Sequence, residues 1–598
     1  MLAGCARPAA RPVMPPPAPV QTKVAPPPAP VSPWAAIPVR VMTWTPHGVQ
    51  QIGQWPGTVA QPMPERWYVE PIRKLDEAGL ATLVGLVRAE HVPGLSLRNQ
   101  PVAPWLGALR DLPELGALLL DGTGVDGPAL GAMQLSLKRL YLARTAIDDA
   151  AVAALAERYP ALEALDVEDT AVSDAAARAI ARLGELHALN IAGTQLGDDG
   201  GAALATLGKL EIADLGSTRV GRKTIAALRG LPLRELFLDH TRVRGEIATL
   251  AALAPALVRF DISSTAHHPT DAELAWLATA PNLVEIGLSG AKVHDPLALT
   301  LVKRPGLREL RLAETAITTA TIHAIAARTD LEEIDLADTP VDDASAAALL
   351  AGPQMRIARL DGTPITDAAL AARPGPQLVE LFLSRTSIDD RAMAFLDGAP
   401  RLTALGLGHT GLGDGGIERI ARLSALRTLV LSNVHVSPSA LAKLGALTAL
   451  ERLYLDQVHV DDAVLAALAP ARDTLRVLHL AGSDVSEDGL DALHAFGELE
   501  ELTIGDSRMH AAIADLSAWP RLRTLSLVGL ELTDKVLPSL AAHPTLAILD
   551  LSATEIRDPS PLAALPHLRT LGVAQTRLSP AGVAAIKRLI ARGVEVVR

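Results

Sequence analysis

The sequence predicts an α/β solenoid, with a parallel sheet on its concave side and helices on its convex side. Three observations predict this class. The pattern L-x-x-L-x-L-x-x-T-x-[VIL] recurs through most of the 598 residues. Each copy is followed by an Ala- and Leu-rich stretch with helical spacing. Apolar residues make up 49% of the chain although only 3% are aromatic, so Leu, Ile, Val and Ala must fill the core.

The threonine of the pattern marks the register of about 21 repeats. Successive marks are 22 to 26 residues apart, and a regular period of this length is the signature of a repeat array. Fourteen marks are Thr and two are Ser. The marks lie at positions 100, 123, 145, 170, 194, 218, 241, 265, 291, 315, 339, 363, 386, 410, 434, 458, 483, 507, 530, 554 and 576.

In each repeat the L-x-L segment predicts a short strand, because alternation with period 2 turns one face inward and the other outward. We expect the hydroxyl at the mark to satisfy backbone groups of the neighbouring turn, which would otherwise be buried without a partner. Five marks lack the hydroxyl, and two of them are consecutive, which predicts a soft point there. They are Gln100, Ala291, Val434, Val458 and Leu530.

Eleven repeats carry Asp four residues after the mark, where the helical stretch begins. Asp at that place is expected to cap the helix, since its carboxylate accepts bonds from free N–H groups and opposes the helix dipole. A row of calcium sites is the alternative, but acidic ligands at positions 1, 3 and 5 of one loop do not recur. The Asp positions are 149, 174, 198, 295, 343, 367, 390, 414, 462, 534 and 558.

These repeats resemble the leucine-rich repeat family over about 500 of the 598 residues, as in LRELFLDHTRV (233–243), LVELFLSRTSI (378–388) and LAILDLSATEI (546–556). The period near 24, with Thr at the mark, is similar to the ribonuclease-inhibitor-like and cysteine-containing subtypes and their bacterial relatives. The resemblance implies a horseshoe that binds a protein or a peptide.

The chain divides into five segments. Residues 1–64 hold 16 of the 44 prolines and no acid, and the first part of them is an extended spacer. The helix expected over 76–92 has no clean strand before it and closes the N-terminal end of the array. The segments are a lipobox-like start (1–5), a Pro-rich tether (6–33), an N-terminal cap (34–92), the repeats (93–593) and a C-terminal cap strand (594–598).

Leu2-Ala3-Gly4-Cys5 resembles the lipobox of bacterial lipoproteins. The resemblance implies that Cys5 is lipidated and that Ala6 directs the protein to the outer membrane. The basic and apolar regions of a secretory signal are absent from these residues. No stretch of 18 uncharged apolar residues occurs, so a lipid would be the membrane contact. We expect a location at the bacterial cell envelope, and a cytoplasmic location is the alternative.

No motif predicts an enzyme, a metal site or a cofactor. The glycines of 405–420 lie in register with the repeats, and no phosphate-loop lysine follows them. His267 and His268 are adjacent and His294 lies one repeat later, which is not a zinc-ligand spacing. Cys5 lies in the tether, so it is not the nucleophile of a catalytic triad.

The outward strand positions, at six, four and two residues before each mark, carry 16 acidic and six basic side chains. This excess predicts a partner with a basic patch, and the net charge of −12 argues against nucleic acid. Cross-strand pairing of the arginines with acids is the structural alternative. The candidate charged binding residues are Asp214, Glu235, Asp261, Glu285, Glu309, Arg311, Glu333, Asp335, Arg359 and Glu380.

Four aromatic residues share the outward position four residues before the mark: Tyr141, Phe237, Phe382 and Tyr454. The chain has only nine Phe and Tyr in total, so this ladder is a concentration. Aromatic anchors favour an interface, whereas ordinary strand propensity is the alternative.

Three functions remain open. The first is a non-enzymatic scaffold that binds a protein or peptide on the acidic concave face. The second is a substrate receptor resembling bacterial effectors with an F-box before the repeats, for which residues 65–92 show no convincing match. The third is a binder of envelope glycans, whose stacking residues would be Trp34, Trp44, Trp55 and Trp67.

Overall fold

A computed structural model describes residues 33–45, 48–508, 513 and 515–598 of the chain. The predicted lipidation residue Cys5, and the part of the predicted tether before residue 33, lie outside the described residues. The structure therefore bears on the repeats and on the two ends of the array.

The described residues form one 25-stranded sheet. Strand β1 pairs in antiparallel fashion with β2 and β3, β3 pairs in parallel with β4, and every later strand pairs in parallel with the next. The strands are β1 (Val39–Thr45), β2 (Gly48–Trp55), β3 (Trp67–Pro71), β4 (Gly94–Ser96), β5 (Ala117–Leu119), β6 (Arg139–Tyr141), β7 (Ala164–Asp166), β8 (Ala188–Asn190), β9 (Ile212–Asp214), β10 (Glu235–Phe237), β11 (Arg259–Asp261), β12 (Glu285–Gly287), β13 (Glu309–Arg311), β14 (Glu333–Asp335), β15 (Ile357–Arg359), β16 (Glu380–Phe382), β17 (Ala404–Gly406), β18 (Thr428–Val430), β19 (Arg452–Tyr454), β20 (Val477–His479), β21 (Glu501–Thr503), β22 (Thr524–Ser526), β23 (Ile548–Asp550), β24 (Thr570–Gly572) and β25 (Glu595–Val597).

The predicted solenoid is confirmed. Strands β4 to β24 belong to the 21 predicted repeats, and each ends four residues before its mark. The inward leucines of a repeat are fully buried, as Leu236 and Leu238 are, so the core is a continuous stack of aliphatic side chains between the sheet and the outer helices. Strand β25 adds one more parallel strand after the last repeat.

The convex elements are shorter than the predicted helices, and many are 3₁₀ turns. A repeat of about 24 residues leaves little chain for the return, and a 3₁₀ turn rises further per residue than an α-helix. The α-helices are α1 (Glu77–Ala89), α2 (Gly127–Ala132), α3 (Asp149–Arg158), α4 (Asp174–Ile180), α5 (Asp198–Ala203), α6 (Arg222–Leu228), α7 (Asp271–Leu274), α8 (Asp295–Val302), α9 (Thr319–Ala326), α10 (Asp343–Leu350), α11 (Asp414–Ile420), α12 (Pro438–Leu441), α13 (Asp462–Ala467), α14 (Leu490–His494), α15 (Leu537–Ala541) and α16 (Pro580–Ala591). The 3₁₀ helices are η1 (Pro33–Ala35), η2 (Ala103–Ala108), η3 (Leu204–Thr206), η4 (Ile247–Leu253), η5 (Ala275–Thr279), η6 (Asp367–Leu370), η7 (Asp390–Gly398), η8 (Ala442–Ala446), η9 (Ala469–Ala471), η10 (Glu487–Gly489), η12 (Leu516–Ala518), η13 (Asp534–Val536) and η14 (Ser560–Ala564).

The mark hydroxyl bonds within its own repeat, which corrects the expectation of a bond to the neighbouring turn. In thirteen repeats the Thr Oγ1 donates to the carbonyl three residues earlier, at 2.5 to 2.7 Å, as Thr339 does to Leu336. The hydroxyl thus holds the chain where it leaves the strand. Thr265 is the exception among the threonines, because its buried Oγ1 has no partner.

In ten of the eleven repeats the repeated Asp is the first helical residue, so its assignment as the helix cap was wrong by one position. In the eleventh, Asp558 precedes Pro559, the cap of η14. The cap of α3 is Asp148, and Asp149 is the first helical residue. In ten of the eleven repeats this Asp accepts the backbone N–H of the capping position in the next repeat, as Asp149 does from Ser173 at 2.7 Å. The carboxylates therefore join neighbouring repeats in a ladder along the convex side.

The N-terminal end is closed by the three antiparallel strands and by α1. Strand β3 precedes α1 and pairs with β4, which corrects the expectation that no clean strand comes before this helix. The Trp34 and Trp55 rings lie 5.0 Å apart, and Trp55 meets Trp67 edge-on at 5.7 Å. Gln100, the first mark, accepts the Leu75 N–H at 2.9 Å, so its amide ties this end to the first repeat.

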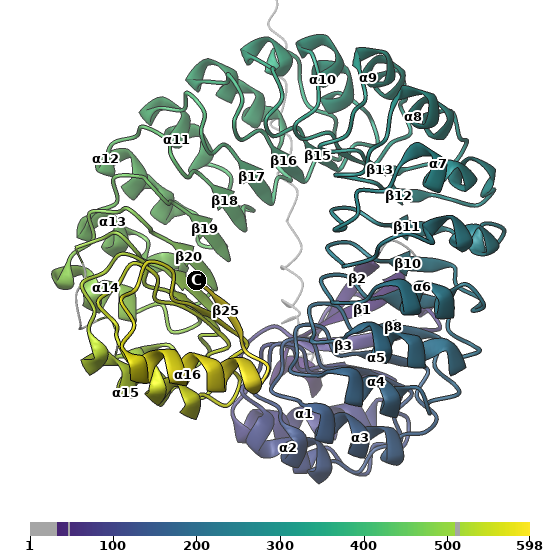
Figure 1. Cartoon of the computed structure of the whole chain (residues 1–598), viewed down its shortest axis with the longest axis vertical. Helices are drawn as coiled ribbons and strands as arrows, with labels where there is room; N and C mark the ends of the chain where they lie inside the picture. The colour runs from purple at the N-terminus through teal and green to yellow at the C-terminus, as the bar shows by residue number, and fades with distance from the viewer. Residues whose placement is uncertain (1–32, 46–47, 509–512, 514) are drawn as a thin grey trace, which may run out of the picture.

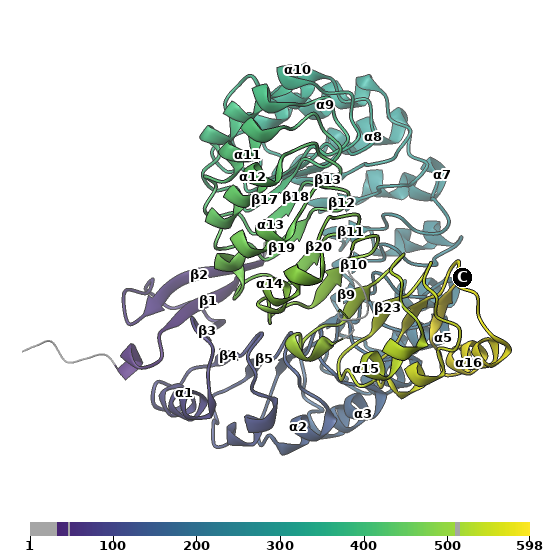
Figure 2. The same cartoon turned by 90° about the vertical axis from the view of Figure 1, so that its left-hand side faces the viewer.

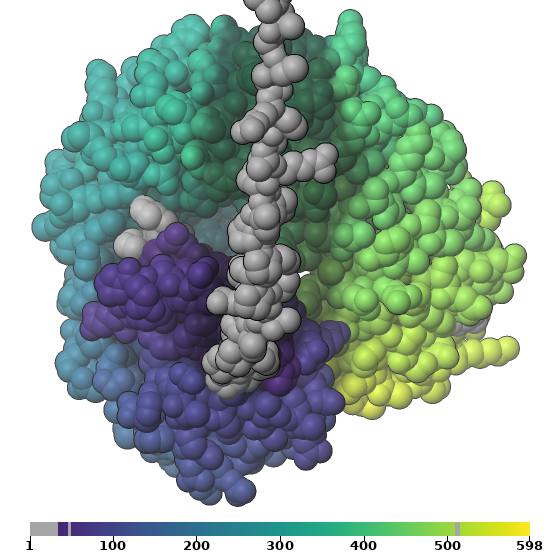
Figure 3. Space-filling model, turned by 180° about the vertical axis from the view of Figure 1, so that it is seen from behind, coloured from purple at the N-terminus to yellow at the C-terminus, as the bar shows by residue number. Residues whose placement is uncertain are grey.

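The solenoid curves until its C-terminal repeats meet its N-terminal repeats (Figures 1 and 2). We call these two groups of repeats the last turn and the first turn of the solenoid. An α-helix is about 10 Å wide whereas strands are about 4.8 Å apart, so each repeat is a wedge and a long array bends toward its strands. Contacts between distant repeats join the two turns, for example the ion pair of Lys74 with Glu498. Figure 3 shows the N-terminal strands (purple) against the rim of the central hollow.

Candidate functional site on the concave face

The candidate site is the concave face of strands β9 to β16. We call it the inner charged strip and define it by the ten predicted charged residues together with Phe237, Asp239, Arg259, Asp361 and Phe382. In the parallel register Glu235, Arg259, Glu285, Glu309 and Glu333 are successive neighbours in one row. A second row, four residues before the marks, runs from Asp214 through Arg311 to Phe382.

Arg311 is the centre of the strip. Its Nη1 donates to Asp261 at 2.9 Å and to Glu285 at 2.7 Å, and its Nε donates to Glu333 at 3.0 Å. Its Nη2 lies 3.3 Å from Glu309. Glu333, Glu285 and Asp261 outweigh the effect of burial and raise the pKa of this guanidinium. One arginine therefore binds four carboxylates, of which Asp261 and Glu333 are 72 residues apart in sequence. The pairing of arginines with acids on neighbouring strands, which the sequence had left as an alternative, is thus observed at Arg311.

A glycine makes this cluster possible. Gly287 lies between Asp261 and Arg311 in the second row, and it has no side chain to separate them. A Cβ at Gly287 would lie 2.1 Å from a carboxylate oxygen of Asp261. Asp261 and Arg311 consequently meet across the intervening strand.

Two further arginines extend the ion pairs to both sides. Arg259 bonds Glu285 and lies 3.4 Å from Glu235, while Arg359 lies 3.0 Å from Glu333 and 3.3 Å from Glu380. Each guanidinium also lies over an aromatic ring. The distances from the guanidinium carbon to the ring centre are 5.8 Å for Arg259 over Phe237 and 5.6 Å for Arg359 over Phe382.

The strip holds more carboxylates than its arginines neutralise. Ten acidic residues, counting Asp239 and Asp361, face three arginines. Burial, together with Glu285 and Glu333, raises the pKa of Glu309 to about 7. Burial likewise raises the pKa of Asp214 to about 7 and raises the pKa of Asp335. By contrast, Arg311 and Arg259 overcome the burial of Glu285 and lower its pKa. The strip is a partly desolvated band of excess negative charge.

A sequence profile described as Leucine Rich repeat matches residues 186–205, which include strand β8 and helix α5. The repeats on both sides have the same strand, mark and return. The chain has the fold of a leucine-rich repeat solenoid.

The solved structures to which this chain is similar share little of its sequence. The ectodomain of the Arabidopsis thaliana receptor kinase GASSHO1/SCHENGEN3, solved with CASPARIAN STRIP INTEGRITY FACTOR 2, is 17% identical with a TM-score of 0.33, covering 88% of this chain and 65% of its own. The Arabidopsis receptor kinase HAESA, solved with the peptide hormone IDA and the co-receptor SERK1, is 16% identical with a TM-score of 0.35, covering 85% and 90%.

A leucine-rich repeat protein of Leptospira interrogans is 17% identical with a TM-score of 0.27, and the match covers 70% of this chain and 92% of that one. No curated protein matches the chain.

Two of the four predicted aromatic anchors lie outside the strip. The Tyr141 ring stacks on Trp44 of β1 at 6.2 Å, so the N-terminal strands cover it. Tyr454 lies six strands before the C-terminal end and meets His479 edge-on at 4.6 Å. Only Phe237 and Phe382 therefore flank the charged cluster, and both are half-buried.

The remaining candidates are occupied by local contacts. His267 pairs with Glu273 at 2.8 Å and His294 with Asp271 at 2.9 Å. No group of three His, Cys, Asp or Glu in the described part of the chain is arranged to hold a metal ion. Among the helices that the structure describes, none combines the length and apolar character needed to cross a bilayer.

Proposed function

We propose that this leucine-rich repeat solenoid is a non-enzymatic scaffold that holds a basic segment of a partner protein, or a basic peptide, on the inner charged strip. Solenoids of this kind use their concave surface for binding. The observation that carries the proposal is the charge of the strip, where ten carboxylates face three arginines that already have carboxylate partners.

Lys or Arg side chains of the partner would supply the missing positive charge. Glu309 and Asp214 are the best candidates to receive them, because burial and, at Glu309, neighbouring acids make their negative charge costly without a cation. Phe237 and Phe382 border the cluster and add apolar contact at its two ends. Affinity for the partner should therefore rise between pH 5 and 8 as these carboxyl groups lose their protons.

A pull-down from envelope and cytosolic fractions tests the proposal. The test variant combines Phe237→Ala, Phe382→Ala, Glu309→Gln and Asp335→Asn, and its fold is checked by circular dichroism. The control variant, Glu157→Gln with Asp473→Asn, removes two exposed acids that lie off the concave face. A partner retained by the wild type and the control but lost by the test variant supports the proposal. A partner retained by all three, or by none, contradicts it.

We also propose that the protein is a bacterial lipoprotein attached through Cys5 and facing the periplasm or the outside. This part rests on the Leu2–Cys5 sequence and on the Pro-rich segment after it. The reading frame upstream of Met1 tests it. A basic start followed by roughly 7–15 apolar residues supports an anchor, and a polar upstream sequence contradicts it.

The tryptophans of the N-terminal segment do not need a glycan to explain their clustering. Trp34, Trp55 and Trp67 pack on one another, and Trp44 contacts Tyr68 at 4.6 Å. These contacts favour a packing role for the four rings.

A further inference from the structure

The last turn of the solenoid contacts the first through arginines that donate to backbone carbonyls. Each acceptor is the residue just before a mark, and each has a positive φ, so its carbonyl points out of the solenoid edge. Arg521 donates to the Asn99 carbonyl at 3.0 Å, Arg523 to that of Arg144, and Arg569 to that of Gly193 at 3.3 Å. We call the boundary between the two turns the seam.

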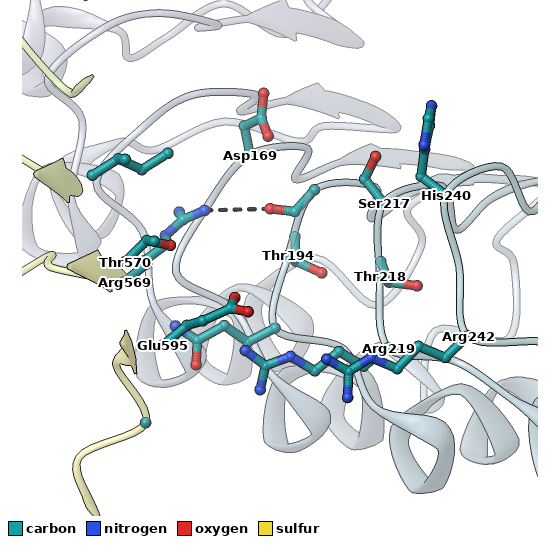
Figure 4. Close-up of a pocket in the computed structure, with 14 residues that line it drawn as sticks. Asp169, Thr194, Ser217, Thr218, Arg219, His240, Arg242, Arg569, Thr570 and Glu595 are labelled. Atoms are coloured by element: carbon teal, nitrogen blue, oxygen red, sulfur yellow. Dashed lines mark hydrogen bonds between the residues drawn. The ribbon is translucent and has the colours of Figure 1, made fainter. Parts of the chain in front are cut away.

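The seam contains two adjacent cavities of about 350 and 280 Å³. They share Asp169, Ile548 and Arg569, and we call the two together the seam pocket. Figure 4 shows the larger cavity, with Arg569 and Glu595 entering from the last turn and Arg219 and Arg242 from the first. Space of this size accommodates a small molecule.

Positive charge dominates the seam pocket although the whole chain is acidic. Seven arginines and four acidic residues line it. Among them, Arg523 and Arg569 form no ion pair with any carboxylate of the described residues, and the buried Nε of Arg569 has no hydrogen-bond partner. Burial lowers the pKa of Arg569 to about 10; Asp169 opposes this shift, and Arg523 adds to it. These two guanidiniums are half-buried cations, and the acids near them, Asp169 and Glu500, do not form ion pairs with them.

Such an arrangement is costly unless something supplies the missing negative charge. The planar guanidinium matches phosphate and carboxylate groups through paired N–H bonds. Arg219 and Arg242 are exposed on the opposite wall. Within the part of the chain that the structure describes, their guanidinium groups have no hydrogen-bond or ion-pair partner. An anion between the walls would contact both turns.

We propose that the seam pocket binds a small molecule bearing phosphate or carboxylate groups, which bridges Arg523 and Arg569 of the last turn to Arg219 and Arg242 of the first. Binding holds the two turns together, so the ligand stabilises the closed form of the solenoid. This site lies away from the inner charged strip and does not depend on the function proposed for it.

Titration calorimetry and thermal unfolding of the full chain test the site, with pyrophosphate and citrate as probes and sodium chloride matched in ionic strength as the blank. We expect saturable binding of at least one probe and a higher midpoint of unfolding with that probe. Tighter binding of pyrophosphate assigns a phosphate ligand, and tighter binding of citrate assigns a carboxylate ligand. No saturable binding of either probe overturns the proposal.

Two variants and a control locate the binding. Arg523→Gln with Arg569→Gln removes the half-buried cations, and Arg219→Gln with Arg242→Gln removes the exposed ones, whose side chains make no contact that holds the fold. Each pair should weaken binding about tenfold or more, since charge-assisted hydrogen bonds are lost. The control changes two exposed arginines, Arg178→Gln in α4 and Arg182→Gln just after it, and should bind like the wild type. Equal weakening in the control and in the seam variants overturns the proposal.

Discussion

At the scale of single residues, the charged strip depends on the absence of one side chain. Asp261 is 6% exposed, and it bonds both Arg311 and the N–H of Ser263. Both bonds require the space above Gly287. The charged cluster therefore depends on the uncharged residue Gly287.

Gly287→Ala should lower the free energy of unfolding by about 1–3 kcal/mol, because the new methyl group displaces the Asp261 carboxylate and leaves buried charges unpaired. Urea unfolding measures the change. Gly208→Ala is the control, since its Cβ would meet nothing within 4 Å. Equal effects of the two changes would show that Asp261 has room to move.

Glu309 should make stability depend on pH. In the folded state it keeps its proton up to pH about 7, whereas its ordinary pKa is 4.5. The folded protein therefore binds more protons than the unfolded chain between these values, and the contribution of Glu309 to stability falls as pH rises through that window. Urea unfolding at pH 5, 6, 7 and 8 measures this. The wild type should lose stability relative to Glu309→Gln from pH 5 to 8, and a difference that is constant with pH contradicts the assignment.

At the scale of elements, each repeat is fastened by two kinds of polar contact. The mark threonine closes the strand end, and the helical Asp joins the next repeat. Both contacts bind backbone groups: the threonine hydroxyl donates to a carbonyl, and the Asp carboxylate accepts an N–H. The two contacts can be separated by variants at matched positions.

Thr339 and Thr265 occupy the same place in different repeats, but only Thr339 has a hydrogen-bond partner. Thr339→Val should cost about 1 kcal/mol of unfolding free energy because its bond to Leu336 is lost. Thr265→Val should be neutral or stabilising, since it replaces an unsatisfied buried hydroxyl. Thermal unfolding of the two variants compares them directly. A similar loss in both would mean that shape, and not the hydroxyl, decides the position.

Asp198 and Asp199 are neighbours with different contacts. The Asp198 carboxylate accepts the N–H groups of Gly221, Lys223 and Thr224, whereas exposed Asp199 only pairs with Lys223. Asp198→Ala should therefore cost about 2–3 kcal/mol, and Asp199→Ala less than about 0.5 kcal/mol. Urea unfolding distinguishes them. Equal costs would argue against a ladder between repeats.

At the scale of the whole molecule, cooperativity depends on every repeat being held to the next. Each repeat contacts mainly its neighbours, so a weak repeat weakens the array locally. The consecutive marks Val434 and Val458 are buried and apolar, and they cannot make the hydroxyl bond of the other repeats. Contacts across the seam add a second connection between the ends.

Amide hydrogen exchange should find the soft point near residues 434–458. We expect the strand ends of these repeats to open with a lower free energy than those of the repeats marked by Thr339 and Thr363, which retain the bond. Mass spectrometry of peptic fragments measures both regions in one experiment. Uniform protection across β14 to β19 would show that packing alone sustains the array.

The sequence predicted which residues face the concave side, but it did not predict which of them contact one another. The register placed Glu309, Arg311 and Phe382 on the concave face because strand alternation is local. The covering of Tyr141 by Trp44 was not foreseen, since it depends on how the N-terminal strands fold back. Gly287 was missed because an outward position without a side chain shows its importance only when its neighbours Asp261 and Arg311 are known to meet across it.

The sequence by itself determined the number of repeats, their register and the face to which each strand residue belongs, since a period near 24 and an alternation of 2 are properties of short segments. Tertiary structure alone decided which charges meet and that the two ends of the solenoid contact each other. Arg311 reaches Asp261 over 50 residues of sequence, and Arg569 reaches Gly193 over 376. Such contacts depend on the curvature that accumulates over many wedge-shaped repeats, and no single repeat encodes that sum.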